Sequence, residues 1–254
     1  MINKQVISKF LWIGLLVIAT SNPPVQAFLT VDEQIDDYLE ILAYNTSYKR
    51  EVLRRLQWSG ITDVRLYDEI EKQLLAGYLR TDLDKASRGM LSHLARALAC
   101  SGNNKYRSTL EIVRTNAVTS QVRNHAKKAL IQLDDYIVWN ELIAVSDINV
   151  EGKHVEEAAY MKMLDTDNVM VQRLAARGIF HDKLLDPDVL ALAAVKLTNL
   201  YWKPGLDNQA QDSIAWLCKA IGQSGWVEYK DLLSRVAERS PYKKIKNYAR
   251  KYAS

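Results

Sequence analysis

Basic residues recur four positions apart in four segments of the chain. This spacing places both side chains of a pair on one face of an α-helix, so each pair presents two cations in one direction. Clustered Arg and Lys side chains bind carboxylates and phosphates, so the eight residues are candidates for an anion-binding surface. They are Arg50, Arg54, Arg123, Lys127, Arg173, Arg177, Lys246 and Arg250.

The same eight residues also have a purely structural interpretation. Basic side chains commonly pair with carboxylates of adjacent turns and neighbouring repeats, or remain in water, and an exposed pair contributes only about 0–1 kcal/mol. If the eight residues form a binding surface, reversing their charges should weaken partner binding and leave stability unchanged. If they instead pair with acids of adjacent turns and repeats, reversal should lower the melting temperature. The sequence leaves both interpretations open.

Other side chains form no recognisable catalytic or metal-binding motif. The four histidines, His93, His125, His154 and His181, have no partner at the spacing of a zinc motif such as HExxH. The sequence contains no GxSxG elbow, no Gly-rich phosphate loop and no CxxC pair. We therefore assign no catalytic residue, metal ligand or cofactor, and the sequence leaves enzymatic activity undecided.

The elements that position the basic pairs occur twice in the chain. Ser101 and Gly102 recur as Ser224 and Gly225, an offset of 123 positions (225 − 102 = 123). The same offset relates Arg50 to Arg173, Arg54 to Arg177, Asp63 to Asp186, Tyr78 to Tyr201, Tyr106 to Tyr229 and Asn124 to Asn247. A gap-free offset over some eighty residues indicates a tandem duplication of one structural block.

Each block reads as a series of helices. Apolar residues recur at three- and four-residue spacing, for example Ile214, Leu217, Cys218 and Ile221, and no alternating strand-length run has turn residues around it. Thr30 and Glu33 form a capping-box pattern before the first helix. Thr62 is the expected cap of the third helix. The predicted fold is all-α, with helices packed as an elongated stack.

Two stretches carry the pattern of a known repeat family. In the first, Ala97 and Leu98 precede Ser101–Tyr106, then Leu110 and Val113, and Val122, Ala126 and Ala129 follow on a second helix; the second copy repeats this order. The pattern resembles bacterial HEAT-repeat proteins, including the phycobilisome-lyase-like type. The resemblance implies a right-handed α-solenoid of HEAT/armadillo-like repeats. Members of this family mostly bind other proteins. Gln172 departs from it, standing where an Arg is usual.

The sequence predicts a signal peptide followed by two helical blocks joined by a linking segment. Residues 1–27 have a positive start, a short apolar run and Val25–Ala27 as a cleavage site, so we expect a signal peptide and an exported, periplasmic or secreted protein. The expected blocks span 28–133 and 154–254, with a linking helix and loop over 134–153. We expect Cys100 and Cys218 to remain unbridged, and Trp58, Trp202 and Trp226 to pack under turns.

Composition narrows the classes of partner. The formal charge is +4, and loss of Lys4 and Lys9 with the signal would lower it to +2, which together with export argues against nucleic acid. We expect no transmembrane segment after removal of the signal. The leading hypothesis is a non-catalytic scaffold that binds a protein or peptide along a concave face. The alternatives are an exported lyase- or hydrolase-like enzyme, or a binder of anionic envelope polymer or lipid headgroups. The sequence does not give the oligomeric state.

Overall fold

The computed structural model describes residues 30–44, 47–145 and 152–253. Within these ranges the chain is all-helical, with no strand. The expected signal peptide and residues 146–151 of the linking segment expected over 134–153 lie outside the described residues. None of the described helices is long and apolar enough to cross a bilayer.

The helices form successive antiparallel pairs, and the packing is consistent with a helical repeat fold. The first block contains α1 (Val31–Ala43), α2 (Lys49–Arg55), α3 (Val64–Gly77), α4 (Lys85–Ala99), α5 (Arg107–Asn116) and α6 (Ser120–Ile143). The second contains α7 (Val155–Asp165), α8 (Val169–His181), α9 (Pro187–Leu200), α10 (Asn208–Gly222), α11 (Val227–Arg239) and α12 (Lys243–Ala253). A 3₁₀ turn, Asn104–Tyr106, precedes α5.

Helix boundaries reproduce the offset of 123 residues. Adding 123 to the bounds of α3 and α4 gives those of α9 and α10, and α12 begins 123 residues after α6. The caps repeat as well, because Asp63 and Asp186 accept backbone N–H bonds at the starts of α3 and α9. The unusual backbone also repeats: Gly60 has φ 69° and its counterpart Lys183 has φ 54° (60 + 123 = 183).

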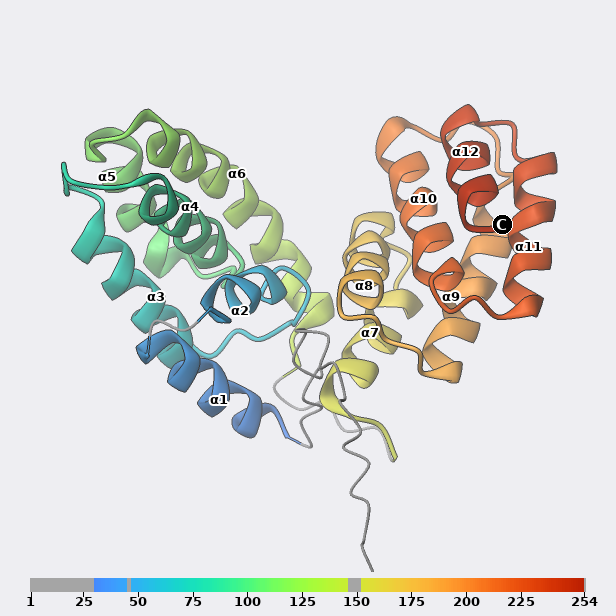
Figure 1. Cartoon of the computed structure of the whole chain (residues 1–254), viewed down its shortest axis with the longest axis horizontal. Helices are drawn as coiled ribbons and strands as arrows, with labels where there is room; N and C mark the ends of the chain where they lie inside the picture. Colours follow the sequence, from blue (N-terminus) through green and yellow to red (C-terminus); the bar gives the residue numbers. More distant parts are fainter. Residues whose placement is uncertain (1–29, 45–46, 146–151, 254) are drawn as a thin grey trace, which may run out of the picture.

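Each block has two layers. The first helices of the pairs contact one another in the order α1–α3–α5 and α7–α9–α11, and the second helices contact in the order α2–α4–α6 and α8–α10–α12. Figure 1 shows the blocks as two arms that meet near α2, α7 and α8 and diverge from there. Leucine, isoleucine, alanine and tyrosine side chains fill the space between the layers.

The second block does not simply continue the stack of the first. Among the described helices, α6 and α7 make the most backbone contact across the blocks, and this contact is small compared with those inside each block. The long helix α6 returns along the ends of α4 and α2, where the Asn140 Nδ2 donates to the Ser101 carbonyl (2.8 Å) and the Tyr136 hydroxyl to the Gln57 carbonyl (2.6 Å). Each block therefore starts at the junction and extends outward from it (Figure 1).

Several local expectations can be compared with the structure. Thr30 and Glu33 form the capping box, but Asp63 and not Thr62 caps α3, because its carboxylate reaches the Arg65 N–H (2.8 Å). The expected linking helix is the second half of α6, since no Gly or Pro interrupts 120–143.

The three tryptophans expected to pack under turns differ in their burial, and the two cysteines can be described with them. Trp58 is buried, whereas Trp202 is 57% exposed and does not pack under its turn. Trp226 is half-buried and stacks on Tyr229. Cys100 and Cys218 are free and buried, and burial raises the pKa of each thiol to about 12.

Candidate functional site

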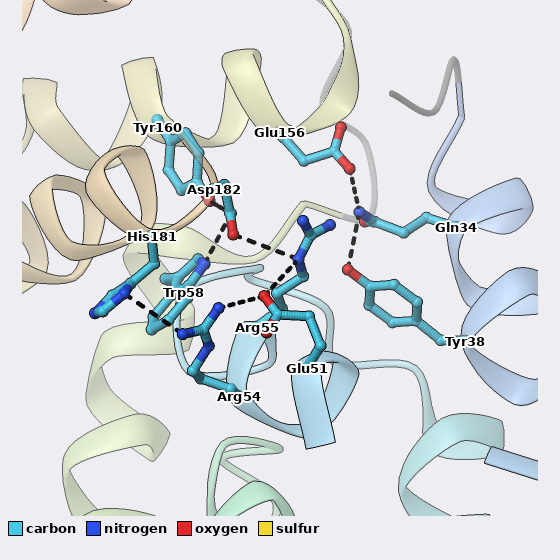
Figure 2. Close-up of polar contacts among 10 residues, drawn as sticks. All are labelled: Gln34, Tyr38, Glu51, Arg54, Arg55, Trp58, Glu156, Tyr160, His181 and Asp182. Atoms are coloured by element: carbon cyan, nitrogen blue, oxygen red, sulfur yellow. Dashed lines mark hydrogen bonds and ion pairs between the residues drawn. The ribbon is translucent and has the colours of Figure 1, made fainter. Parts of the chain in front are cut away.

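A buried polar network joins the two arms at their starting pairs (Figure 2). Asp182, the C-cap of α8, accepts a hydrogen bond from the Trp58 Nε1–H (3.1 Å) and another from the Tyr160 hydroxyl. Its second oxygen lies 3.3 Å from Nε of Arg55 on α2. Nearby, the Gln34 amide donates to Glu156 (2.6 Å), which links α1 to α7.

Burial controls the electrostatics of this network. Burial raises the pKa of Asp182, and the Arg55 guanidinium with the Tyr160 and Trp58 donors opposes that shift. The Asp182 charge in turn raises the pKa of Arg55 against the effect of desolvation, so Arg55 stays cationic. The adjoining cavity has a volume of about 10 Å³, enough for one water and too small for an organic ligand. The network therefore holds the arms together and is not itself a ligand site.

A second feature lies on the second-layer helices beside this network. Each of these helices, or in the case of α2 the turn directly after it, carries an aromatic or imidazole ring with a cation three or four residues away. We call this set the ring–cation stripe. Its rings are Trp58, His93, His125, His181, Trp216 and Tyr248, and its cations are Arg54, Arg96, Lys128, Arg177, Lys219 and Lys251.

The two arms meet in the stripe through reciprocal contacts. Trp58 and its counterpart His181 stack with ring centroids 5.4 Å apart and an interplanar angle of 10°. The Arg54 Nη1 lies 3.5 Å from the His181 Nδ1, and the counterpart Arg177 lies over the Trp58 ring at 5.6 Å. An equivalent residue of each arm thus contacts the ring of the other, an arrangement that gives the junction a local two-fold character.

The second arm holds its cations against aromatic faces. Arg177 also lies 5.7 Å from the Trp216 ring centroid, and its Nη2 donates to the Gln57 side chain at 3.3 Å. The Lys219 Nζ lies 3.6 Å from the Trp216 centroid and 4.6 Å from that of Tyr248. Ring faces attract cations through their quadrupole, worth about 0.5–2 kcal/mol each, but do not neutralise the charge.

The stripe contains an excess of positive charge. Among the described residues, Arg96, Arg177 and Lys219 make no ion pair with a carboxylate. The nearest acid of the second arm, Asp212, is already shared by Arg173 (2.6 Å) and Lys244 (2.6 Å). Burial and the neighbouring cation Arg173 both lower the pKa of Arg177.

The histidines respond to this positive field. Burial lowers the pKa of His181 to about 4, with Arg54, Arg177 and Lys219 acting in the same direction. Burial and Arg96 lower the pKa of His93, and burial, Arg96 and Lys128 lower that of His125. Three neutral imidazoles therefore border the cations at neutral pH. The electrostatic energy of an anion placed among these groups would be favourable.

The eight residues predicted from spacing do not share one environment. Arg54 and Arg177 come together around Trp58, 5.9 and 5.6 Å from its ring centroid, and Arg54 is also ion-paired with Glu51. Arg173 is ion-paired with Asp212, and the Arg123 Nη1 donates to the carbonyls of Ala117 (2.6 Å) and Val118 (2.9 Å). The remaining members make no ion pair among the described residues: Arg50, Lys127 and Arg250 are exposed, and Lys246 is partly buried.

The sequence reasoning missed Arg96 on α4, Lys219 on α10 and the role of the rings beside them. A signal was present, because Arg96 corresponds to Lys219 at the offset of 123 (96 + 123 = 219), so both copies are basic there. Likewise Trp58 and His93 correspond to His181 and Trp216. A ring at the same position in both copies, always beside a cation, marks the stripe.

No group of His, Cys, Asp and Glu in the described part of the chain has the geometry to hold a metal ion. Comparison with known protein families and with curated protein sequences finds no match for this chain. The candidate site therefore rests on its own geometry, a row of cations and neutral rings with few carboxylates beside them.

Proposed function

We propose that this protein is an exported, HEAT-like α-solenoid scaffold that binds an acidic segment of a partner protein between its two arms. The ring–cation stripe is the binding surface. The HEAT assignment is supported by the sequence resemblance and by the paired, two-layer helices. Export is supported by the pattern of residues 1–27 alone.

The single observation that carries the proposal is the state of Arg177. Its guanidinium is partly buried between two indole rings and has no carboxylate partner among the described residues. Removing a cation from water without a counter-charge is unfavourable, and a bound anion would relieve that cost. A carboxylate of the partner supplies the charge, and Arg binds carboxylates through two parallel N–H bonds.

The shape of the stripe favours an extended peptide over a single small anion. Cations recur on successive helices of both arms, at Arg96, Arg177 and Lys219 among others, so one Glu or Asp side chain cannot satisfy them all. An acidic chain laid across α4, α8 and α10 would meet one cation per helix. Aromatic rings beside each cation provide contact area for the apolar parts of the peptide.

A charge-removal experiment tests the proposal. Binding of a fluorescein-labelled Glu-rich peptide is measured by anisotropy for the wild type and for Arg177→Gln/Lys219→Gln. We expect about a hundredfold loss of affinity, since a hydrogen bond to a charged group contributes about 1.5–3 kcal/mol. The matched control is Arg235→Gln/Arg239→Gln, which removes two exposed cations from first-layer helix α11 and should retain the affinity.

The same assay discriminates among the classes of partner. Equal weakening by both double variants would show that only net charge matters and would refute the stripe as the site. Tighter, Arg177-dependent binding of polyphosphate or of vesicles with anionic headgroups would replace the peptide by an envelope polymer or lipid. Added salt should weaken peptide binding in every case, because exposed charges are screened within about 10 Å at 0.1 M.

A further inference from the structure

A groove in the first arm has no equivalent set of residues in the second. It lies among α2, the end of α3 and the start of α4, and has a volume of about 450 Å³. This size falls in the range of small-molecule pockets, about 300–1,000 Å³. Its floor and walls are mainly apolar, with Leu83, Met90, Leu91 and Leu94, and Arg50 stands at its rim.

Small side chains open the groove. Ala76, Gly77 and Ala86 line it, and their counterparts at the offset of 123 are Asn199, Leu200 and Gln209. Leu200 is partly buried and packs against the core of its own arm. At Gly77 a Cβ would already meet the Leu91 side chain at 2.6 Å, so nothing larger than glycine fits there without movement of Leu91. At these three positions the first copy thus carries smaller side chains than the second.

The two copies also differ in whether the basic residue at this position has an acidic partner. In the second arm Arg173 is neutralised by Asp212 at 2.6 Å. The counterparts are Arg50 and Gly89 (212 − 123 = 89), so the first arm keeps the cation and lacks the acid. Nothing lies within 4 Å of the position a Cβ of Gly89 would occupy. Arg50 is exposed and forms no ion pair within the described ranges.

The other polar groups of the groove are already engaged. Arg80 is bound to Asp82 by two hydrogen bonds, at 3.0 and 2.8 Å. The Gln73 amide donates to the Leu42 carbonyl and to Glu69, and its oxygen accepts from Lys49. Arg50 is therefore the group left to recognise a charged ligand.

We propose that this groove binds a small carboxylate amphiphile, with the carboxylate on Arg50 and the alkyl chain over Leu83, Met90 and Leu94. The charge of Arg50 favours a carboxylate, and the apolar lining of the groove favours an alkyl chain. Met90 suits such a ligand because its unbranched thioether adapts to different chain shapes. The site shares no residue with the ring–cation stripe, although Arg50 is close enough to His93 to lower its pKa, and it does not depend on the function proposed for the stripe.

Calorimetric titration of the full chain with decanoate tests the proposal. Arg50→Gln should weaken binding by roughly tenfold or more, as expected for loss of a charged hydrogen bond. Arg173→Gln removes the counterpart cation and should leave decanoate binding unchanged. Binding of 1-decanol, which lacks the charge, should be the same in wild type and Arg50→Gln.

A second pair of variants restores the charge pattern of the other copy. Gly89→Asp introduces a carboxylate at the position equivalent to Asp212. It should weaken decanoate binding about tenfold, because the new carboxylate pairs with Arg50. Gly89→Asn has nearly the same shape without the charge and should bind like wild type. The Met90 methyl resonance should shift on titration with decanoate, also in Arg177→Gln/Lys219→Gln, which separates this site from the stripe.

Several outcomes would overturn the assignment. They are the absence of binding at submillimolar decanoate, equal affinities for Gly89→Asp and Gly89→Asn, an effect of Arg173→Gln as large as that of Arg50→Gln, or an unmoved Met90 methyl. Arg50 is exposed, and a Cβ at Gly89 would have no other atom within 4 Å, so the variants test the ligand contact and not the integrity of the core.

Discussion

Single residues of the ring–cation stripe are tuned by their neighbours, and His181 shows this most clearly. Its imidazole stacks on Trp58, approaches Arg54 and faces Arg177 and Lys219, so a proton added to the ring enters a positive field. Burial acts in the same direction, and together they lower its pKa to about 4. The ring is therefore neutral at physiological pH and serves as an aromatic surface for the adjacent cations.

The lowered pKa of His181 predicts how stability depends on pH. Between about pH 6.5, the ordinary value for histidine, and pH 4, the unfolded chain binds a proton that the folded chain does not. Acidification through this window therefore destabilises the fold, and the contribution is fully present above pH 6.5. We expect denaturant unfolding of His181→Phe to show a smaller loss of stability over this window than wild type. Identical pH slopes would contradict the assignment.

At the scale of helices, much of the architecture followed from the sequence. The repeated Ser-Gly turns and Asp caps gave the offset of 123, and α3 and α9 begin and end at positions related by it. The repetition could be predicted because turn and cap residues act on backbone groups only two or three residues away, but the cap of α3 was expected one residue early, at Thr62 and not at Asp63.

The face of each second-layer helix that carries the stripe is set by tertiary packing and was missed. In α6 the buried stripe passes through Val122, Ala126 and Ala129. At about 100° per residue, Arg123 and Lys127 lie on one flank of this stripe, and His125 and Lys128 on the other. Both flanks are polar, so the sequence pattern alone could not select between them. The choice is made by α6 returning to the junction, which depends on contacts far apart in the chain.

The two copies of one turn provide a test at this scale. Gly102 and Gly225 both have positive φ, 57° and 69°, which costs a residue with a Cβ about 1–2 kcal/mol. At Gly225 nothing else lies within 4 Å of a Cβ, whereas at Gly102 the Cβ would meet the Asn140 side chain and the Tyr136 carbonyl (2.6 Å), both on α6. We expect Gly225→Ala to lose about 1–2 kcal/mol and Gly102→Ala distinctly more, by at least about 1 kcal/mol.

Urea unfolding of the two alanine variants measures this difference directly. A larger loss for Gly102→Ala would show that the second half of α6 packs closely over the turn of the first arm. Equal losses would mean that backbone strain alone determines the cost and that α6 does not press on Gly102. Because α6 carries the chain back to the junction, the comparison also tests the route by which the second arm reaches its place.

The whole molecule depends on how two similar arms are joined. A single stack of repeats would bury the last pair of the first block against the first pair of the second. Here only α6 of that last pair makes such contact, with α7, and the two starting pairs also meet, through the Trp58–His181 stack and the Asp182 network. The stripe residues of both arms consequently approach each other near the junction, and the arms diverge beyond it (Figure 1). The junction therefore determines the geometry of the proposed binding surface.

Asp182 is the position at which this connection can be tested. It accepts hydrogen bonds from Trp58 and Tyr160 and pairs with Arg55, and it is only 5% exposed. Asp182→Asn keeps the shape but removes the charge opposite Arg55, and breaking a buried pair in this way costs about 3–5 kcal/mol. Asp212→Asn is the matched control, because Asp212 pairs with Arg173 and Lys244 inside one arm and is less buried.

We expect urea unfolding to show a loss of about 3–5 kcal/mol for Asp182→Asn and about 1 kcal/mol for the control. Since Asp182 connects α8 to α2, the variant should also loosen the arms relative to each other, which small-angle scattering would record as a larger radius of gyration below the unfolding transition. Affinity for the acidic peptide should fall with it, because Arg54 and Arg177 would no longer share Trp58. A variant with wild-type stability and dimensions would show that the network is dispensable and that the α6–α7 contact alone holds the arms.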